Sequence, residues 1–157
     1  MNNGFFKVPV PQNEPVKQYA PNTEERKKLQ EAIAEWRSKE VDIPMYIGGK
    51  EVRSGNKVRI APPHDHKHTL GYFHKSNKEH IHQAIDAALA AKPQWEALSW
   101  EQRSSIFLKA ADLIANKYRY KLNAATMLGQ SKNPFQAEID SACELIDFFE
   151  VQCLFYV

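Results

Sequence analysis

From Ser76 onward the sequence repeats one helix-start pattern, which leaves this half of the chain few options other than helices. The runs "SNKE" and "SWEQ" pair Ser76 with Glu79 and Ser99 with Gln102, the spacing of a capping box. Apolar residues at helical spacing follow both boxes and predict two helices, the first ending near Pro93. The expected inward-facing residues are Ile81, Ile85, Ala88 and Leu89 in the first helix and Ile106, Phe107, Ala110, Leu113 and Ile114 in the second.

Further helices are expected on both sides of this pair. Asn22 and Glu25 resemble an N-cap and its return partner, and the spacing that follows predicts a helix to about Lys39. A shorter helix is expected over residues 118–128. The last begins near Pro134, a favoured first-turn residue, and runs through "FQAEIDSACELIDFFEVQCLFYV".

Between the helices the sequence is β-prone. Gly48 and Gly49 separate two short strands in "IPMYIGGKEV", which is a strong hairpin signal. "KVRIAP" and "HTLGYFH" predict two more strands, and residues 1–21, rich in proline, predict an extended arm. The expected fold class of this chain is α-rich α+β, with a small β-hairpin region and four to five helices.

The run "HDHKH" links the last two strands. His64, His66 and His68 occupy alternate positions, so on a flat strand their imidazoles could converge on a zinc ion. Pro62 and Pro63 come directly before the run and favour a loop instead. We therefore expect a solvated connection and no metal ligand, with the imidazoles of His66 and His68 bonded to backbone or water.

Composition excludes several partners. The net charge is +2, and the basic residues alternate with acids, as in "EERKK", so no nucleic-acid surface is expected. No run has the apolar length of a membrane span. The first residues resemble neither a secretory signal nor a transit peptide, which predicts a cytoplasmic location. Cys143 and Cys153 lie ten residues apart within one predicted helix and are expected to stay reduced.

Several blocks of the sequence resemble one enzyme family. They are "NEPV", "AIDAALAAKPQWEALSWEQRSSIFLKAADLIANKY", "ATMLGQSKNPFQAEID" and "SACELIDFF". In this order they resemble the N-terminal segment of Δ1-pyrroline-5-carboxylate (glutamate-γ-semialdehyde) dehydrogenases, within the aldehyde dehydrogenase superfamily. The similarity runs from about Asn13 to Phe149, and the arm together with "QAEIDSACELIDFF" distinguishes this family within the superfamily.

The resemblance implies an α/β enzyme with a Rossmann-like cofactor domain, a catalytic domain and an oligomerisation flap. Residues 22–157 would be the N-terminal part of the NAD-binding domain, preceded by the arm over residues 1–21. It also implies NAD-dependent oxidation of a small molecule, L-glutamate γ-semialdehyde, to L-glutamate in proline degradation, by a homo-oligomer. The family's nucleotide loop, general-base glutamate and nucleophilic cysteine match no motif here. We therefore expect a fragment that is inactive alone, without catalytic or cofactor-binding residues.

One residue in range is implied to touch the substrate. Glu144 of "SACELIDFF" occupies the position at which the family carries a glutamate near the substrate's α-amino group, and a carboxylate suits an ammonium. The alternative is a helix-surface acid like Glu138 or Asp140, and Asp147 is a weaker candidate. Cys143 is expected to be a small packed thiol, and Lys132 part of a helix connector.

The apolar end of the chain keeps a second function open. Phe148, Phe149, Val151, Cys153, Leu154, Phe155, Tyr156 and Val157 form a nearly continuous apolar tail. A soluble domain would not leave such a surface in water. The alternative is thus a non-enzymatic helical interaction module that docks through this C-terminal helix.

Overall fold

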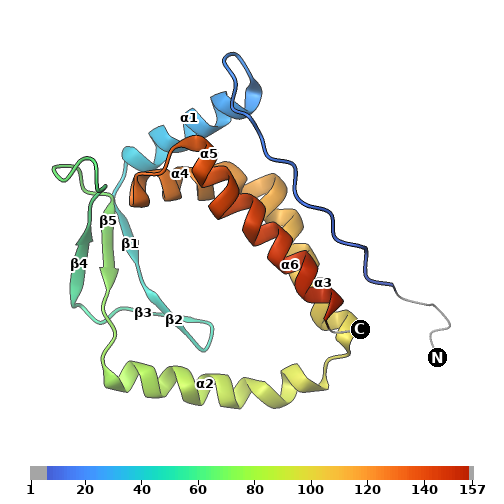
Figure 1. The fold of residues 1–157 in the computed structure, drawn as a ribbon. Coiled ribbons are helices and arrows are strands. Elements are labelled where there is room, and N and C mark those ends of the chain that lie inside the picture. Colours follow the sequence, from blue (N-terminus) through green and yellow to red (C-terminus); the bar gives the residue numbers. More distant parts are fainter. Residues whose placement is uncertain (1–6, 156–157) are drawn as a thin grey trace.

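The computed structural model describes residues 7–155. Figure 1 shows a packed group of helices, a small β region beside it, and helix α2 spanning the space from the β region to α3. The elements are α1 (Glu24–Arg37), β1 (Val41–Ile43), β2 (Met45–Ile47), β3 (Lys50–Val52), β4 (Lys57–Ile60), β5 (Gly71–His74), α2 (Lys78–Ala97), α3 (Trp100–Leu113), the π-helical η1 (Ile114–Tyr118), α4 (Arg119–Gln130), α5 (Pro134–Ala137), the π-helical η2 (Glu138–Cys143) and α6 (Glu144–Leu154). The expected α-rich α+β class is confirmed.

The core lies where α1 packs against α4 and α3 against α6. Its largest cluster joins Leu29 and Ala32 of α1, Ala124 of α4, and Tyr19 of the arm, all of them buried. Each apolar side chain removed from water there contributes on the order of 1.5–3 kcal/mol when large. The predicted first helix is present as α1, but its expected Asn22 cap is wrong: the N-cap residue is Thr23, and no side chain caps the helix.

The β region contains the predicted hairpin. Strands β2 and β3 pair antiparallel around Gly48 and Gly49, whose φ angles of 57° and 76° are both in the left-handed region. The other sheet has the order β1-β5-β4, with β5 parallel to β1 and antiparallel to β4. At Gly71 a Cβ would lie 2.1 Å from the carbonyl oxygen of Val41, so this strand pairing requires glycine.

Helix α2 differs from the prediction in three respects. Its capping box uses Asn77 and His80 in place of Ser76 and Glu79, and the helix continues through Pro93 to Ala97. No residue of α2 is buried. The residues expected to face a core are exposed instead, namely Ile81 at 54%, Ile85 at 50% and Leu89 at 61%, with Ala88 exposed as well.

The exposure of α2 and its continuation through Pro93 have a common physical cause. Among the described residues α2 packs against β2, and near its end the Trp95 ring contacts Phe107 of α3 edge-on. No core covers the apolar face formed by Ile81, Ile85 and Leu89, which are all exposed. Pro93 removes the hydrogen bond that the Leu89 carbonyl would receive. Because the helix is solvated at this point, water can bind that carbonyl and the helix need not end. On α3, the predicted box of Ser99 and Gln102 is confirmed, but Ile106 is 50% exposed.

The last predicted helix is divided in the structure. The Asn133 side chain caps α5, and Pro134 is its first residue, as predicted. The helix then widens into η2 before α6 begins at Glu144. A π turn inserts one extra residue and changes the direction of every side chain that follows it, which is why such turns are frequent at functional sites.

Candidate functional site

A buried ionic cluster joins η2, α4 and the N-terminal arm. We call it the Arg119 cluster: Arg119, Glu138, Glu14, Tyr19 and Asn123. Arg119 is 1% exposed and Glu138 is completely buried. The guanidinium of Arg119 donates to both carboxylate oxygens of Glu138, with Nε at 3.0 and 3.3 Å, and also forms an ion pair with Glu14.

Glu138 accepts further hydrogen bonds that complete the cluster. The Tyr19 hydroxyl donates to its Oε2 at 2.5 Å, and Asn123 Nδ2 donates to the same oxygen at 2.7 Å. The view of Glu138 as an example of a helix-surface acid is therefore wrong, because its side chain is completely buried. The local pattern gives no sign of this because the charge that neutralises Glu138 lies 19 positions earlier, on α4.

The arm is bound to this cluster through its backbone. The Lys17 N–H donates to Glu138 at 2.9 Å, and the Pro15 carbonyl accepts from Arg119 Nη2 at 2.8 Å. The Glu14 N–H donates to Asp147 Oδ1 at 2.7 Å. In Figure 1 the arm accordingly runs as an extended segment beside α6. From position 7 to position 20 the arm forms neither helix nor strand.

Electrostatics keeps the pair ionised. Burial alone would raise the pKa of Glu138, but the hydrogen bonds from Arg119, Tyr19 and the Lys17 N–H outweigh burial and lower it below the ordinary value. For Arg119, burial opposes the charge, but the Glu138 and Glu14 carboxylates raise the pKa. Burial, followed by the bond to Glu138, raises the pKa of Tyr19.

Glu144, the predicted substrate contact, begins α6 directly after η2. Its side chain is exposed, and within the described part of the chain it has no hydrogen bond or ion pair. Asp147, one turn later, already accepts the Glu14 N–H. Of the acids named from the sequence, Glu144 is thus the one whose carboxylate is available to a ligand.

Neither cysteine has the environment of a nucleophile. Cys143 is buried as expected, and burial raises the pKa of its thiol to about 11. Burial also raises the pKa of Cys153, which is fully buried and donates to the Ser104 carbonyl at 3.6 Å. A reactive cysteine needs the opposite shift, toward thiolate at neutral pH. Both thiols are free.

The histidine link folds as turns and not as a strand. The His68 N–H donates to the Asp65 carbonyl at 3.1 Å, and Arg59 binds the carbonyls of His66 and His68 at 2.8 and 2.9 Å. His64 Nδ1 lies 2.8 Å from the Ser131 hydroxyl. Alternate positions therefore do not share one face here. Across residues 7–155, no group of three or more His, Cys, Asp or Glu side chains could hold a metal ion.

The connector after α4 is also accounted for. Lys132 forms an ion pair with Asp140 at 2.6 Å, which ties the connector to η2.

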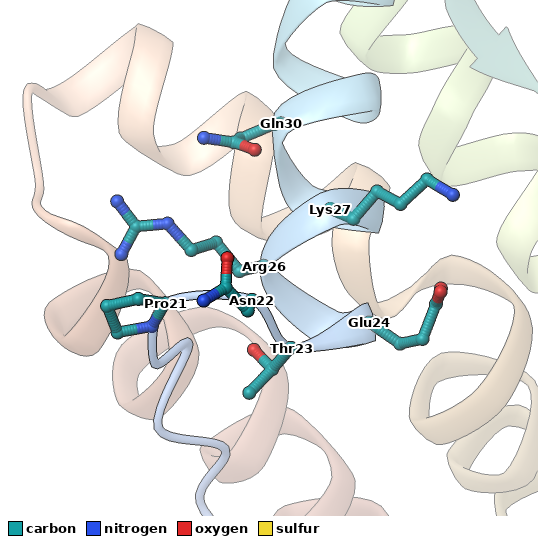
Figure 2. A pocket seen from close by; sticks show the side chains of 7 residues that line it. All are labelled: Pro21, Asn22, Thr23, Glu24, Arg26, Lys27 and Gln30. Atoms are coloured by element: carbon teal, nitrogen blue, oxygen red, sulfur yellow. The ribbon is translucent and has the colours of Figure 1, made fainter.

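A hollow of about 460 Å³ lies at the start of α1. In Figure 2 the Lys27 and Glu24 side chains extend away from the Arg26 guanidinium, which donates to the Tyr19 carbonyl. The lining residues do not converge, so we do not assign a site there.

The described residues do not fit NAD. A dinucleotide needs a glycine-rich turn against a free helix N-terminus. At the N-termini of α2, α3 and α5, capping boxes already bond backbone N–H groups that a phosphate would need. Helix α1 carries Glu24 and Glu25 in its first turn, and their negative charges repel phosphate. Gly48 and Gly49 belong to the hairpin.

The apolar end of the chain is only partly covered. Cys153 is fully buried and Phe149 contacts Phe107, with 5.9 Å between ring centroids. Phe148 and Phe155 are 67% and 77% exposed. Tyr156 and Val157 lie outside the described residues. None of the described helices is both long and apolar enough to cross a membrane.

Comparison with known proteins gives consistent matches. The sequence model of the aldehyde dehydrogenase family matches residues 50–154. The chain is 52% identical over 145 residues to Delta-1-pyrroline-5-carboxylate dehydrogenase of Agaricus bisporus. It is 46% identical over 141 residues to a relative from Dictyostelium discoideum with the same name and the added word mitochondrial. These alignments cover 92% and 90% of this chain but 27% and 25% of the relatives.

A solved structure agrees with them. It is the Delta-pyrroline-5-carboxylate dehydrogenase of Mycobacterium tuberculosis, described as bound with NAD, and it is 42% identical in sequence with a TM-score of 0.95. The match covers 98% of this chain and 29% of the Mycobacterium tuberculosis chain. The chain thus spans between a quarter and a third of these proteins.

Sequence reasoning missed the Arg119 cluster. Its members lie in three segments, and Glu14 and Arg119 are 105 positions apart. The one available signal was the need for the proline-rich arm to lie on something in order to be ordered. That signal predicts a binding surface for the arm but does not identify Arg119.

Proposed function

The chain belongs to the aldehyde dehydrogenase family, and on that premise we propose that it forms part of an NAD-dependent dehydrogenase that oxidises L-glutamate γ-semialdehyde, the hydrolysed form of Δ1-pyrroline-5-carboxylate, to L-glutamate in proline degradation. The observation that carries this proposal is the 52% identity to the Agaricus bisporus relative of that name, over 145 residues. The names of the other relatives reported above agree with it.

In this proposal Glu144 binds the α-ammonium group of the substrate. The support for this role is that Glu144 is exposed and that its carboxylate forms no hydrogen bond or ion pair with any described residue. A charge-assisted hydrogen bond of this kind contributes on the order of 1.5–3 kcal/mol. Glu144→Gln should therefore raise KM for glutamate γ-semialdehyde roughly tenfold or more. The matched control is Asp140→Asn, which changes a neighbouring exposed acid that is paired with Lys132 and should leave KM unchanged.

The hydride chemistry belongs to other residues in this proposal. NAD would accept the hydride, but the described residues do not fit it, and buried thiols such as Cys143 do not suit a nucleophile. We therefore predict that purified residues 1–157 produce no NADH from the aldehyde. From the resemblance to the family alone, we also predict that the active form is a homo-oligomer. Aldehyde-dependent NADH formation by this chain alone would contradict the first prediction, and a monomeric active enzyme the second.

The first experiment is the mass of the native polypeptide, detected through a peptide such as "AADLIANK". A mass far above 18.0 kDa, together with glutamate-semialdehyde-dependent NADH formation, would support the proposal. Cell fractionation then tests the cytoplasmic location, which remains a prediction, since the Dictyostelium discoideum relative is named mitochondrial. A native mass near 18 kDa without activity would refute the enzyme proposal.

One observation supports the second candidate, a helical interaction module. Phe148 of α6 and Phe155, the C-cap residue of this helix, expose two aromatic rings, and exposed apolar surface of this kind favours association. If α6 docks specifically, replacing both residues by serine should convert a defined oligomer into a monomer in size-exclusion chromatography. If the unmodified chain instead forms aggregates of many sizes, and the substitutions only reduce their amount, specific docking is excluded.

A further inference from the structure

The π turn η2 is held at both of its ends by one side chain. Arg119 binds the carboxylate of Glu138, the first residue of η2, and its Nη2 lies 3.4 Å from the Sγ of Cys143, the last. Arg119 and Cys143 are both buried. Contacts from inside the protein therefore hold both ends of this turn.

Glu144 follows η2 directly, so the direction of its side chain depends on this turn. A π turn rotates the residues after it relative to a regular α-helix. If η2 narrowed to a regular turn, Glu144 would point about 100° away around the helix axis, because one residue of an α-helix with 3.6 residues per turn corresponds to that rotation. The Glu144 carboxylate itself forms no hydrogen bond or ion pair with any described residue, so no direct contact fixes its direction.

We propose that Arg119 is a positioning residue for substrate binding, which fixes the π turn through Glu138 and Cys143 and thereby directs the Glu144 carboxylate toward the α-ammonium group of the substrate. This inference rests on the proposed role of Glu144. Arg119 does not touch the substrate. Its planar guanidinium binds Glu138 through two nitrogens while also reaching Glu14 and Cys143, a set of contacts that a lysine cannot reproduce.

The test compares two substrates in the native polypeptide that carries these residues. The first is glutamate γ-semialdehyde, and the second is 5-oxopentanoate, which has the same chain and carboxylate but no ammonium. Arg119→Lys keeps the buried charge, and it should raise KM for the amino substrate about tenfold, while KM for 5-oxopentanoate and both kcat values change less than about twofold. The control Arg37→Lys alters an exposed pair with Asp65 and should change neither KM.

A double mutant separates this inference from the proposed function. If Arg119 acts through Glu144, adding Arg119→Lys to Glu144→Gln should raise KM no further. Hydrogen exchange of the amides of residues 138–144 should be faster in Arg119→Lys, which supports loss of the fixed turn. Equal KM increases for both substrates, or multiplied effects in the double mutant, would mean a general structural role and overturn the inference.

The remaining outcomes are also distinct. If Glu144→Gln raises KM for the amino substrate but Arg119→Lys does not, the inference fails while the proposed substrate contact stands. If Glu144→Gln itself has no effect, the contact fails and the inference fails with it.

Discussion

The Arg119 cluster and helix α2 are stabilised by very different means. In the cluster, Glu14 and Arg119 stand 105 positions apart in sequence, and a partly buried carboxylate meets a guanidinium that is 1% exposed. Helix α2 is 20 residues long, none of them buried, and Figure 1 shows it apart from the packed helices. The comparison shows that contacts among the described residues hold the arm, α4 and η2 together, whereas the apolar face of α2 adds almost nothing to them.

The largest effect is expected on removing the charge of Glu138. Glu138→Gln leaves Arg119 buried without its main partner, and breaking a buried pair in this way costs about 3–5 kcal/mol. Urea unfolding should show this loss in the free energy of unfolding, together with faster proteolysis of the arm. The matched change on α2 is Glu96→Gln, which breaks an exposed pair with Lys92.

The Glu96→Gln variant should unfold like the unmodified chain, because exposed ion pairs contribute little. If Glu138→Gln and Glu96→Gln lowered the free energy of unfolding by similar amounts, burial of the ion pair would not explain the difference between the Arg119 cluster and α2.

The next largest effect compares two isoleucines. Ile146 on α6 is 1% exposed, and Ile146→Ala should lower the free energy of unfolding by about 2–4 kcal/mol through lost burial and a cavity. Ile85 on α2 is half exposed, so Ile85→Ala should cost less than about 1 kcal/mol. Thermal unfolding of both variants measures the difference. An equally large loss at Ile85 would mean that something covers the α2 face.

The same two regions show how far sequence reasoning reaches. Local signals predicted the Gly48-Gly49 hairpin, the Ser99 capping box and the Pro134 helix start, because each depends on residues within a few positions. The direction in which α2 faces was wrong, since periodicity predicts an apolar stripe but not what covers it. The Asn77 box was missed because a histidine nitrogen replaces the usual carboxylate as the return acceptor.

For the candidate site the limit was distance along the chain. Glu144 came from a block of residues that resembles a family, and the structure leaves its carboxylate available. Glu138, six positions earlier, has the same residue type and a similar setting, yet it is completely buried. Only the folded chain brings Arg119 and Tyr19 to it, so the sequence could not distinguish a buried ion pair from a surface acid. The π turn between these two glutamates also has no recognised sequence signal.

A pH experiment tests the buried pair with a smaller effect. The pKa of Glu138 is lowered in the folded chain, so its contribution to stability is complete above the ordinary glutamate value of about 4.3 and is lost as the pH falls through the folded value. The free energy of unfolding should therefore fall more steeply below about pH 4 in the unmodified chain than in Glu138→Gln. Parallel pH curves for the two proteins would show that Glu138 is not ionised in the fold.

The smallest effect is expected at the two asparagine caps, and it distinguishes the regions most directly. Asn77 and Asn133 form the same capping box, at α2 and at α5, and their side chains accept from the backbone N–H three residues on at 2.9 Å in both cases. Replacing either by alanine removes about 1 kcal/mol from its helix.

The two cap variants should differ in where this loss appears. Since α5 continues into the packed η2, Asn133→Ala should lower the free energy of global unfolding by about 1 kcal/mol. Asn77→Ala should instead speed hydrogen exchange in the first turns of α2 and leave global unfolding nearly unchanged, because a helix without buried residues can open locally. If both variants lowered the free energy of global unfolding equally, α2 would unfold together with the packed helices. Its exposed apolar face would then not indicate that α2 opens independently of them.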